Sequence, residues 1–261
     1  MRPRWKTFFA LATLAAFASL SSVPLEIAAL SEVQSHVPWW APVIAFAFGF
    51  VPSVIAVALG IGTLPATNFD LPIIKRLVDR QPVTGVAMRS ILIRSVLFAV
   101  AGFVLVRVFS VWIEPLLVPT LAETARDQSR DTNTFSSLQL TLLSFAAGVR
   151  EELVFRFGLM TLFTWIGIKL FAIPKANSLL IWTANLCAVI PFALVHSINA
   201  IGLGIPVTPG LIAVILLSNG AVGLLFGWLY ARYGLVAAMT AHTVYDFIQF
   251  VIWPGLAESA L

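Results

Sequence analysis

Residues 137–170 read SLQLTLLSFAAGVREELVFRFGLMTLFTWIGIKL, and this stretch decides the fold class. Most of it is apolar, and it exceeds the roughly 20 residues that a helix needs to cross a lipid bilayer. Its length and hydropathy predict a membrane-spanning helix. Because the stretch is too long for one straight crossing, we expect the helix to be tilted or to continue along the membrane surface.

Six further apolar stretches have lengths near a single crossing. The whole chain has 261 residues, of which 59% are hydrophobic and 11% are charged, whereas about a quarter of a soluble domain is charged. Such a chain cannot bury its apolar surface in a water-soluble core, so its solvent must be lipid. The sequence therefore predicts an all-α, polytopic membrane bundle of about seven transmembrane helices. The further stretches lie near residues 7–23, 38–62, 90–112, 178–200, 209–231 and 234–253.

The sequence argues against nucleic-acid binding and against sites built from several cysteines. The formal net charge is +4, but no basic run is interleaved with aromatic residues, so the sequence predicts no nucleic-acid binding. Cys187 is the one cysteine and lies in an apolar stretch, which excludes intramolecular disulfides and CxxC metal sites. The lipid bilayer is the partner that the composition indicates.

Positive charges fall on alternate connections between the apolar stretches. The N-terminus, the second, the fourth and the sixth connections are basic, whereas the first carries Glu26 and Glu32 and the tail carries Glu258. Basic connections stay in the cytoplasm. We therefore expect an integral protein of the cell (inner) membrane with a cytoplasmic N-terminus. The basic residues are Arg2, Arg4, Lys6, Lys75, Arg76, Arg80, Arg89, Lys169, Lys175 and Arg232, and the third connection, residues 123–131, has mixed charge.

The N-terminal stretch has a second interpretation. A basic start followed by apolar residues and by small residues near 16–22 also fits a cleavable signal peptide. We divide the chain into residues 1–130, N-terminal transmembrane helices of no assigned role, and residues 131–261, which hold the residues suited to chemistry.

Ionisable side chains inside a membrane span cost roughly 3 kcal/mol or more, so they usually have a specific task. Here they gather in three apolar stretches. The first reads REELVFR over residues 150–156, the second reads FALVH over 192–196, and the third reads HTVYD over 242–246.

Helical spacing assigns partners to these side chains. Glu152 and Arg156 are four residues apart and can form an ion pair on one face. Glu151 is turned about 100° away from Glu152, which leaves its carboxylate available. His242 and Asp246 are also four apart, and the carboxylate can hold the imidazole in one tautomer.

Each feature taken alone also has a structural interpretation. The Glu152–Arg156 pair and the His242–Asp246 pair can be buried polar contacts, and His196 can bond a neighbouring helix. Arg94 and Arg107 are expected to snorkel or to pack against a partner. Three glycines of the sixth stretch indicate close helix packing; they are Gly220, Gly223 and Gly227.

Taken together, the three segments resemble the signature of the type II CAAX prenyl endopeptidase family, also called the CPBP or Abi family. That signature is Glu-Glu-x-x-x-Arg, then Phe-x-x-x-His, then His-x-x-x-Asn or Asp on successive membrane helices. The chain carries it over about residues 137–250, in the same order and spacing. The matching positions are Glu151, Glu152, Arg156, Phe192, His196, His242 and Asp246.

The resemblance implies an intramembrane endopeptidase that acts on a peptide or protein substrate, lipid-modified or membrane-anchored. It implies that Glu151 is the general base that activates water and that His196 positions this water. It also implies that His242 and Asp246 stabilise the oxyanion, for which a neutral imidazole N–H is a suitable donor, while Glu152 and Arg156 support the site. An ionised Asp246 would repel an oxyanion, so we expect Asp246 to orient His242 instead.

The requirement for a metal stays open at this point. Glu151, His196 and His242 can supply three zinc ligands with water as the fourth. No HExxH is present, and we favour a metal-free reaction with no cofactor. Two other functions also stay open. One is a proton- or ion-coupled transporter, although no internal repeat is found; the other is a catalytically silent relative that recruits partners.

Overall fold

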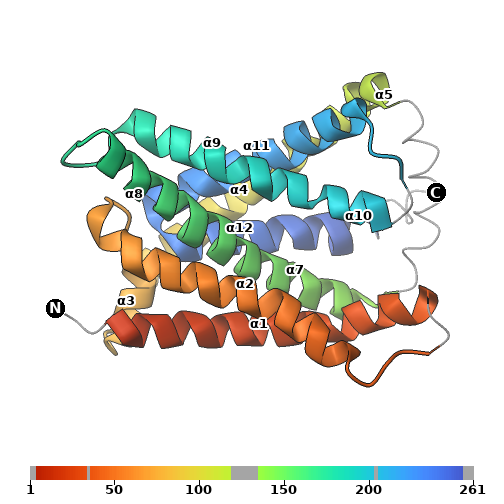
Figure 1. Ribbon diagram of the computed structural model, residues 1–261, viewed down its shortest axis with the longest axis horizontal. Helices are drawn as coiled ribbons and strands as arrows, with labels where there is room; N and C mark the ends of the chain where they lie inside the picture. Colours follow the sequence, from red (N-terminus) through yellow and green to blue (C-terminus); the bar gives the residue numbers. More distant parts are fainter. Residues whose placement is uncertain (1–3, 34–35, 119–134, 203–204, 255–261) are drawn as a thin grey trace.

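The computed structural model describes residues 4–33, 36–118, 135–202 and 205–254, and the regular structure in these ranges is helical. Figure 1 shows long helices that run side by side along one direction. The elements are α1 (Arg4–Val33), α2 (Ala41–Thr63), η1 (Leu64–Ala66), α3 (Pro72–Val78), α4 (Gly85–Trp112), α5 (Glu114–Leu117), α7 (Ser137–Glu151), η3 (Glu152–Met160), α8 (Thr161–Leu170), α9 (Ser178–Val195), α10 (Ser197–Gly202), α11 (Pro209–Tyr233), α12 (Leu235–Phe247) and η4 (Ile248–Ile252).

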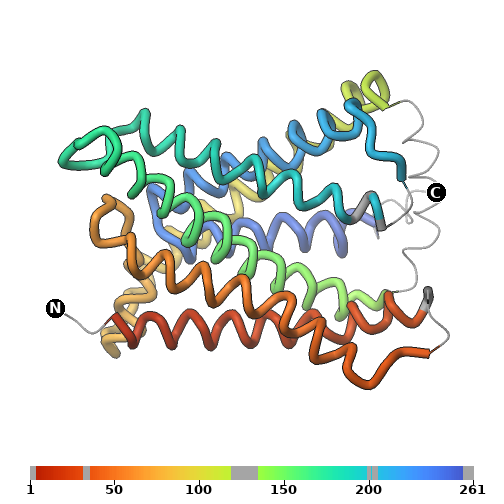
Figure 2. The backbone as a smooth tube through the Cα atoms, viewed as in Figure 1, coloured from red at the N-terminus to blue at the C-terminus, as the bar shows by residue number. Residues whose placement is uncertain are grey.

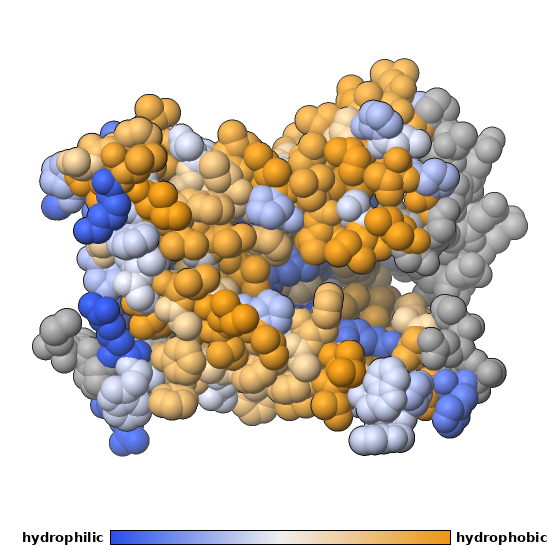
Figure 3. All heavy atoms as spheres, viewed as in Figure 1, coloured by the Kyte–Doolittle hydropathy of each residue, from blue (hydrophilic) through white to orange (hydrophobic). Residues whose placement is uncertain are grey.

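The predicted membrane bundle is confirmed. In the described ranges, seven helical segments are long and apolar enough to cross a membrane. Their outer surfaces expose many large apolar side chains, and Figure 3 shows this apolar surface along the middle of the molecule. In water such a surface would drive aggregation, whereas in a bilayer it contacts acyl chains. The protein is therefore an integral membrane protein.

Two predicted boundaries are wrong. The first helix does not end near residue 23, because α1 continues to Val33 and includes Glu26. Glu26 is tolerated there because its Oε1 lies 3.4 Å from Nη1 of Arg150 on α7. The fifth span ends at Val195 rather than at residue 200, and the short helix α10 follows it.

The long fourth span is one continuous helical segment of 34 residues, Ser137–Leu170. Its middle part, η3, is a π-helix, which is wider than an α-helix. The chain thus passes from α7 through η3 into α8 without an interfacial helix. π-helical turns are rare and often lie at functional sites; this one begins at Glu152.

The fourth span occupies the centre of the bundle. α1 and α2 pack against its α7 and η3 parts, α9 packs against η3 and α8, and α12 packs against α7. The helices α4 and α11 complete the bundle around α12. Figure 2 shows the start of α1 and the end of η4 at opposite ends of the bundle, as an odd number of crossings requires.

Small residues let the central helices approach closely. A Cβ at Gly148 would lie 2.7 Å from the backbone nitrogen of Thr243, so α7 meets α12 without an intervening side chain at this position. Likewise, a Cβ at Gly223 would lie 2.9 Å from Cδ1 of Phe192 on α9, and one at Gly227 would overlap the side chain of Asn185. The prediction of close packing is confirmed for Gly223 and Gly227, whereas Gly220 makes only ordinary contact.

The described elements that carry the lysines and arginines of the predicted topology lie at one end of the bundle, on the left in Figure 1. This end holds the start of α1, all of α3, the start of α4, the connection from α8 to α9, and the end of α11. Arg2, the mixed connection 123–131 and Glu258 lie outside the described residues. The cytoplasmic placement of this basic end remains a prediction.

Candidate active site

The candidate site lies where the end of α7 and the start of η3 face α12. Glu151 is the last residue of α7, Glu152 is the first of η3, and His242 and Asp246 lie on consecutive turns of α12. The close approach at Gly148, one turn before Glu151 and Glu152, brings these carboxylates beside His242. Two segments that are about 90 residues apart in the sequence are thereby joined.

Glu152 is the centre of the cluster. It is 0% exposed, as is Arg156, and the Nε atom of Arg156 lies 3.3 Å from Glu152 Oε2. The predicted ion pair is confirmed. The other oxygen, Oε1, accepts a hydrogen bond from His242 Nδ1 at 2.9 Å. A single carboxylate thus holds a cation on one side and an imidazole on the other.

This second contact adds to the prediction for Asp246. Asp246 was expected to orient the His242 ring, and its Oδ2 lies 3.6 Å from His242 Nε2, within ion-pair distance but beyond hydrogen-bond distance. The hydrogen bond to the ring comes from Glu152 instead. The reason is the pairing of α7 with α12, which places a second carboxylate nearer to the ring than the one on its own helix.

Arg156 is held by more than its carboxylate. Its Nη2 donates to the backbone oxygen of Gly223 on α11 at 3.1 Å. Its guanidinium carbon lies 4.4 Å from the centre of the Phe192 ring on α9, within cation–π range. Arg156 therefore ties η3 to α9 and α11, and it fixes the position of Glu152.

Aromatic rings fix the plane of the His242 imidazole. The Phe226 ring stacks on it with centres 4.8 Å apart, and Phe192 meets it edge-on at 5.9 Å. With Nδ1 bonded to Glu152, these contacts leave the ring one orientation. Nε2 then faces Glu151 Oε2 at 3.7 Å and Asp246 Oδ2 at 3.6 Å.

Glu151 differs from the other carboxylates of the cluster. Its side chain is 27% exposed, whereas those of Glu152 and Asp246 are 0% and 10% exposed. Its Oε2 atom is buried and accepts no hydrogen bond from any residue that the structure describes. The carboxylate predicted to be available is therefore partly accessible and has one unused acceptor.

His196 contacts the Phe192 ring, which also contacts His242. The Phe192 ring is 5.2 Å from the His196 ring and 5.9 Å from the His242 ring. His196 follows the last residue of α9, and its Nδ1 donates to the backbone oxygen of Phe192 at 2.9 Å. This bond assigns the proton to Nδ1 and leaves Nε2 as an acceptor. No hydrogen bond or ion pair within the described ranges joins His196 to Glu151 or His242.

The zinc alternative needs three side chains around one point. Across the part of the chain that the structure describes, no three His, Cys, Asp or Glu side chains are arranged to hold a metal ion. Both His242 nitrogens face carboxylates, and no hydrogen bond or ion pair in the described ranges joins His196 to Glu151 or His242. The ligand set of Glu151, His196 and His242 therefore does not fit a zinc centre in this arrangement.

Several contacts of the site were not predicted from sequence. Arg150 donates to Ser22 and lies near Glu26, so α1 takes part in supporting α7. Phe192 was visible as a motif residue, but its contacts with both histidines and with Arg156 depend on how α9 packs. No sequence pattern pointed to Phe226 or to the Gly223 carbonyl, because phenylalanine rings and backbone oxygens occur throughout apolar helices.

Arg94 and Arg107 pack against neighbouring side chains, as predicted. Arg107 Nη2 donates to Gln249 Oε1 at 3.2 Å, and its guanidinium carbon lies 5.7 Å from the Trp253 ring centre. The guanidinium carbon of Arg94 lies 4.8 Å from the Tyr233 ring centre. Neither arginine takes part in the cluster.

The chain is an integral membrane protein with a polar site inside its helical bundle. Buried carboxylates and an imidazole from several helices meet at this site. Residues 133–248, a little under half of the chain, match the family model described as type II CAAX prenyl endopeptidase, Rce1-like. This segment contains all six candidate residues, and it is the part of the chain that is similar to that family. Comparison with curated proteins and with solved structures gave no match.

Proposed function

We propose that the chain is an intramembrane endopeptidase in which Glu151 activates a water molecule for attack on a peptide bond. The supporting observation is the unused acceptor of Glu151, which lies 3.7 Å from His242 Nε2. A water that lies beside both atoms can hydrogen-bond to each of them. The Rce1-like family match adds the reaction class, because its name specifies a peptidase.

In the proposed reaction, Glu151 takes a proton from the water as the water oxygen attacks the carbonyl carbon. The carbonyl π electrons move to the oxygen, which becomes an oxyanion. Glu151 then gives the proton to the amide nitrogen as the C–N bond breaks. The products are a new carboxyl terminus and a new amine, and Glu151 is a carboxylate again.

His242 is the proposed oxyanion donor. Its Nδ1 donates to Glu152, and its Nε2 faces Glu151 and Asp246, so both nitrogens meet carboxylates. Both nitrogens can donate to these carboxylates only when each of them carries a proton. In that state the Nε2–H group is aimed at the space beside Glu151, where charge develops on the carbonyl oxygen.

The remaining residues act through these two. Glu152 and Arg156 are positioning residues, because they hold the His242 ring without reaching the reacting atoms. Asp246 supports the Nε2 proton from a distance of 3.6 Å. His196, whose Nε2 is an acceptor, would take a hydrogen bond from the attacking water and set its direction.

The proposed substrate is a peptide segment of a lipid-modified or membrane-anchored protein. The site is formed by membrane-spanning helices, so a scissile bond must enter the bundle to reach it. Figure 3 shows a hollow in one face of the molecule with hydrophilic surface at its floor, which gives such a segment a place to enter. A lipid anchor on the substrate would hold it beside this face.

The reaction is tested with the purified chain in liposomes. Farnesylated and unmodified peptides are added in ¹⁸O-labelled water, and the products are analysed by mass spectrometry. We expect cleavage at one bond, one ¹⁸O atom in the new carboxyl group and preference for the membrane-anchored peptide. Failure of correctly inserted protein to cleave any anchored peptide would favour the catalytically silent alternative.

Removal of metal is expected to leave the activity unchanged. The reason is that the carboxylates and histidines do not form a three-ligand set. The same cleavage assay is repeated after treatment with phenanthroline, and bound zinc is measured in the purified protein. Activity that is lost with the chelator and restored by added zinc would overturn the metal-free reaction.

A further inference from the structure

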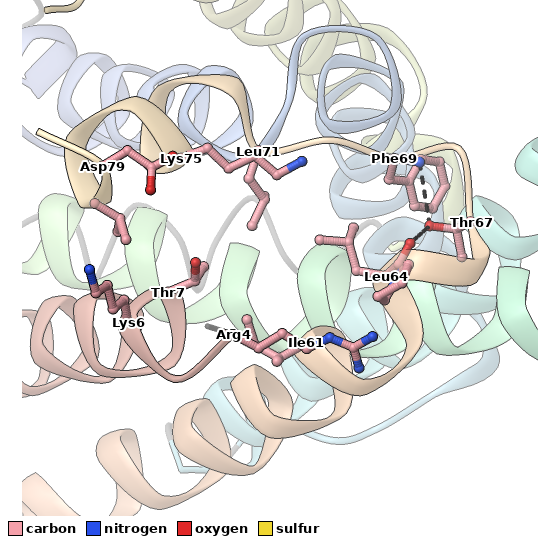
Figure 4. Close-up of a pocket in the computed structure, with 12 residues that line it drawn as sticks. Arg4, Lys6, Thr7, Ile61, Leu64, Thr67, Phe69, Leu71, Lys75 and Asp79 are labelled. Atoms are coloured by element: carbon pink, nitrogen blue, oxygen red, sulfur yellow. Dashed lines mark hydrogen bonds between the residues drawn. The ribbon is translucent and has the colours of Figure 1, made fainter. Parts of the chain in front are cut away.

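A cavity of about 380 Å³ lies at the basic end of the bundle, away from the candidate active site. Figure 4 shows its side chains gathered around one opening, from the start of α1, the end of α2, the α2–α3 connection and α3. No residue of the peptidase cluster lines it. Its lining comprises Arg4, Lys6, Thr7, Ile61, Leu64, Pro65, Thr67, Phe69, Leu71, Lys75, Val78 and Asp79.

The charge around this cavity is positive. Three cations line it against one carboxylate, Asp79. Lys75 also forms an ion pair with Asp70, which lies just outside the lining. Even when each carboxylate offsets one cation, a positive charge remains for a ligand. Arg4 and Lys6, one turn apart or less at the start of α1, are both exposed.

The interior of the cavity is apolar. Phe69 and Leu71 are buried, and Ile61, Leu64 and Val78 are partly buried beside them. Hydroxyl groups come from Thr7 and from Thr67, whose Oγ1 donates to Leu64 O and accepts from Phe69 N. A basic rim over an apolar interior suits a molecule that is anionic at one end and apolar at the other.

The cavity continues onto the outer surface of α1. A second hollow shares Lys6, Val78 and Asp79 with it and extends past Trp5 and Phe9. These two aromatic side chains are 58% and 59% exposed. Tryptophan is enriched at the level of lipid headgroups. The hollow therefore connects the basic rim with the apolar surface that faces acyl chains.

We propose that this cavity binds the anionic headgroup of a phospholipid, with the phosphate at the basic rim and an acyl chain along the Trp5 and Phe9 side of α1. Basic pockets between membrane helices are suited to such headgroups. A free phosphate would use the rim alone, whereas a lipid also fills the apolar interior and the second hollow. The site is independent of the proposed peptidase reaction.

The test uses the full chain in detergent and follows its thermal unfolding during titration with dioctanoylphosphatidylglycerol. We expect saturable stabilisation by this lipid and none by dioctanoylphosphatidylcholine. The Arg4→Gln, Lys6→Gln double variant should bind the anionic lipid about twenty-fivefold more weakly, because each cation near anionic lipid contributes roughly fivefold in affinity. Without lipid, this variant should unfold at the wild-type temperature, since both side chains are exposed.

A matched double variant tests whether lipid binding depends on this cavity or on positive charge anywhere at the same end of the bundle. Lys169→Gln, Lys175→Gln removes two exposed cations that do not line the cavity and should bind within about twofold of wild type. Equal weakening in both double variants, or equal stabilisation by phosphatidylcholine, would overturn the proposal. Equal stabilisation by inorganic phosphate would show that the rim binds free phosphate, and it would overturn the proposal of a lipid ligand.

Discussion

Glu151→Gln is expected to reduce peptide cleavage by about a hundred- to ten-thousandfold, the usual contribution of a general base. Glutamine has the same shape but cannot accept the proton of the attacking water. The variant should accumulate and unfold like wild type, because Glu151 is partly exposed and its Oε2 makes no hydrogen bond within the described part of the chain. Cleavage rates in liposomes and thermal unfolding in detergent measure the two effects.

Glu26→Gln is the matched control for this variant. Glu26 is another partly buried glutamate of a membrane span, it lies 3.4 Å from Arg150, and it is not part of the cluster. Its replacement should leave cleavage near the wild-type rate. A Glu151→Gln protein that is inserted correctly and is fully active would remove the proposed base.

Arg156→Met is expected to lower the free energy of unfolding by about 3 kcal/mol or more, because it leaves the Glu152 carboxylate buried without this cation. The variant also loses the hydrogen bond to Gly223 O and the contact with the Phe192 ring. Cleavage should fall as well, since Glu152 holds His242. Denaturant unfolding of the purified protein measures the loss of stability.

The Glu152→Gln, Arg156→Met double variant separates charge from packing. It removes both charges of the pair, so it should be more stable than Arg156→Met alone. It should still cleave slowly, because a glutamine holds the His242 ring less well than a carboxylate. Wild-type stability in the Arg156→Met protein would contradict the structural importance of the ion pair.

The spans and the local pairs could be predicted from sequence because they depend on short-range patterns. Apolar length gave seven crossings, and a spacing of four residues gave the contacts of Glu152 with Arg156 and of His242 with Asp246. The end of α1 could not be predicted in this way. Glu26 looks like a connection residue until its partner Arg150, on a distant helix, is known.

The contacts between helices depend on packing that no local pattern reports. Glu152 reaches His242 because α7 and α12 touch at Gly148, and the glycine alone does not reveal which helix it faces. The π-helix that begins at Glu152 likewise has no signature in residue spacing. His196 was expected inside the fifth span, whereas it directly follows the last residue of α9, and its contact with the Phe192 ring became visible only with the packing of α9.

The central claim is that Glu151 and His242 act on the same water and carbonyl group as one unit. The most direct test compares cleavage rates of Glu151→Gln, His242→Asn and the double variant in liposomes. Residues that act as a unit give losses that do not multiply. We predict that the double variant is no slower than the slower single variant. A double variant whose loss equals the product of the two single losses would show independent roles and contradict the shared site.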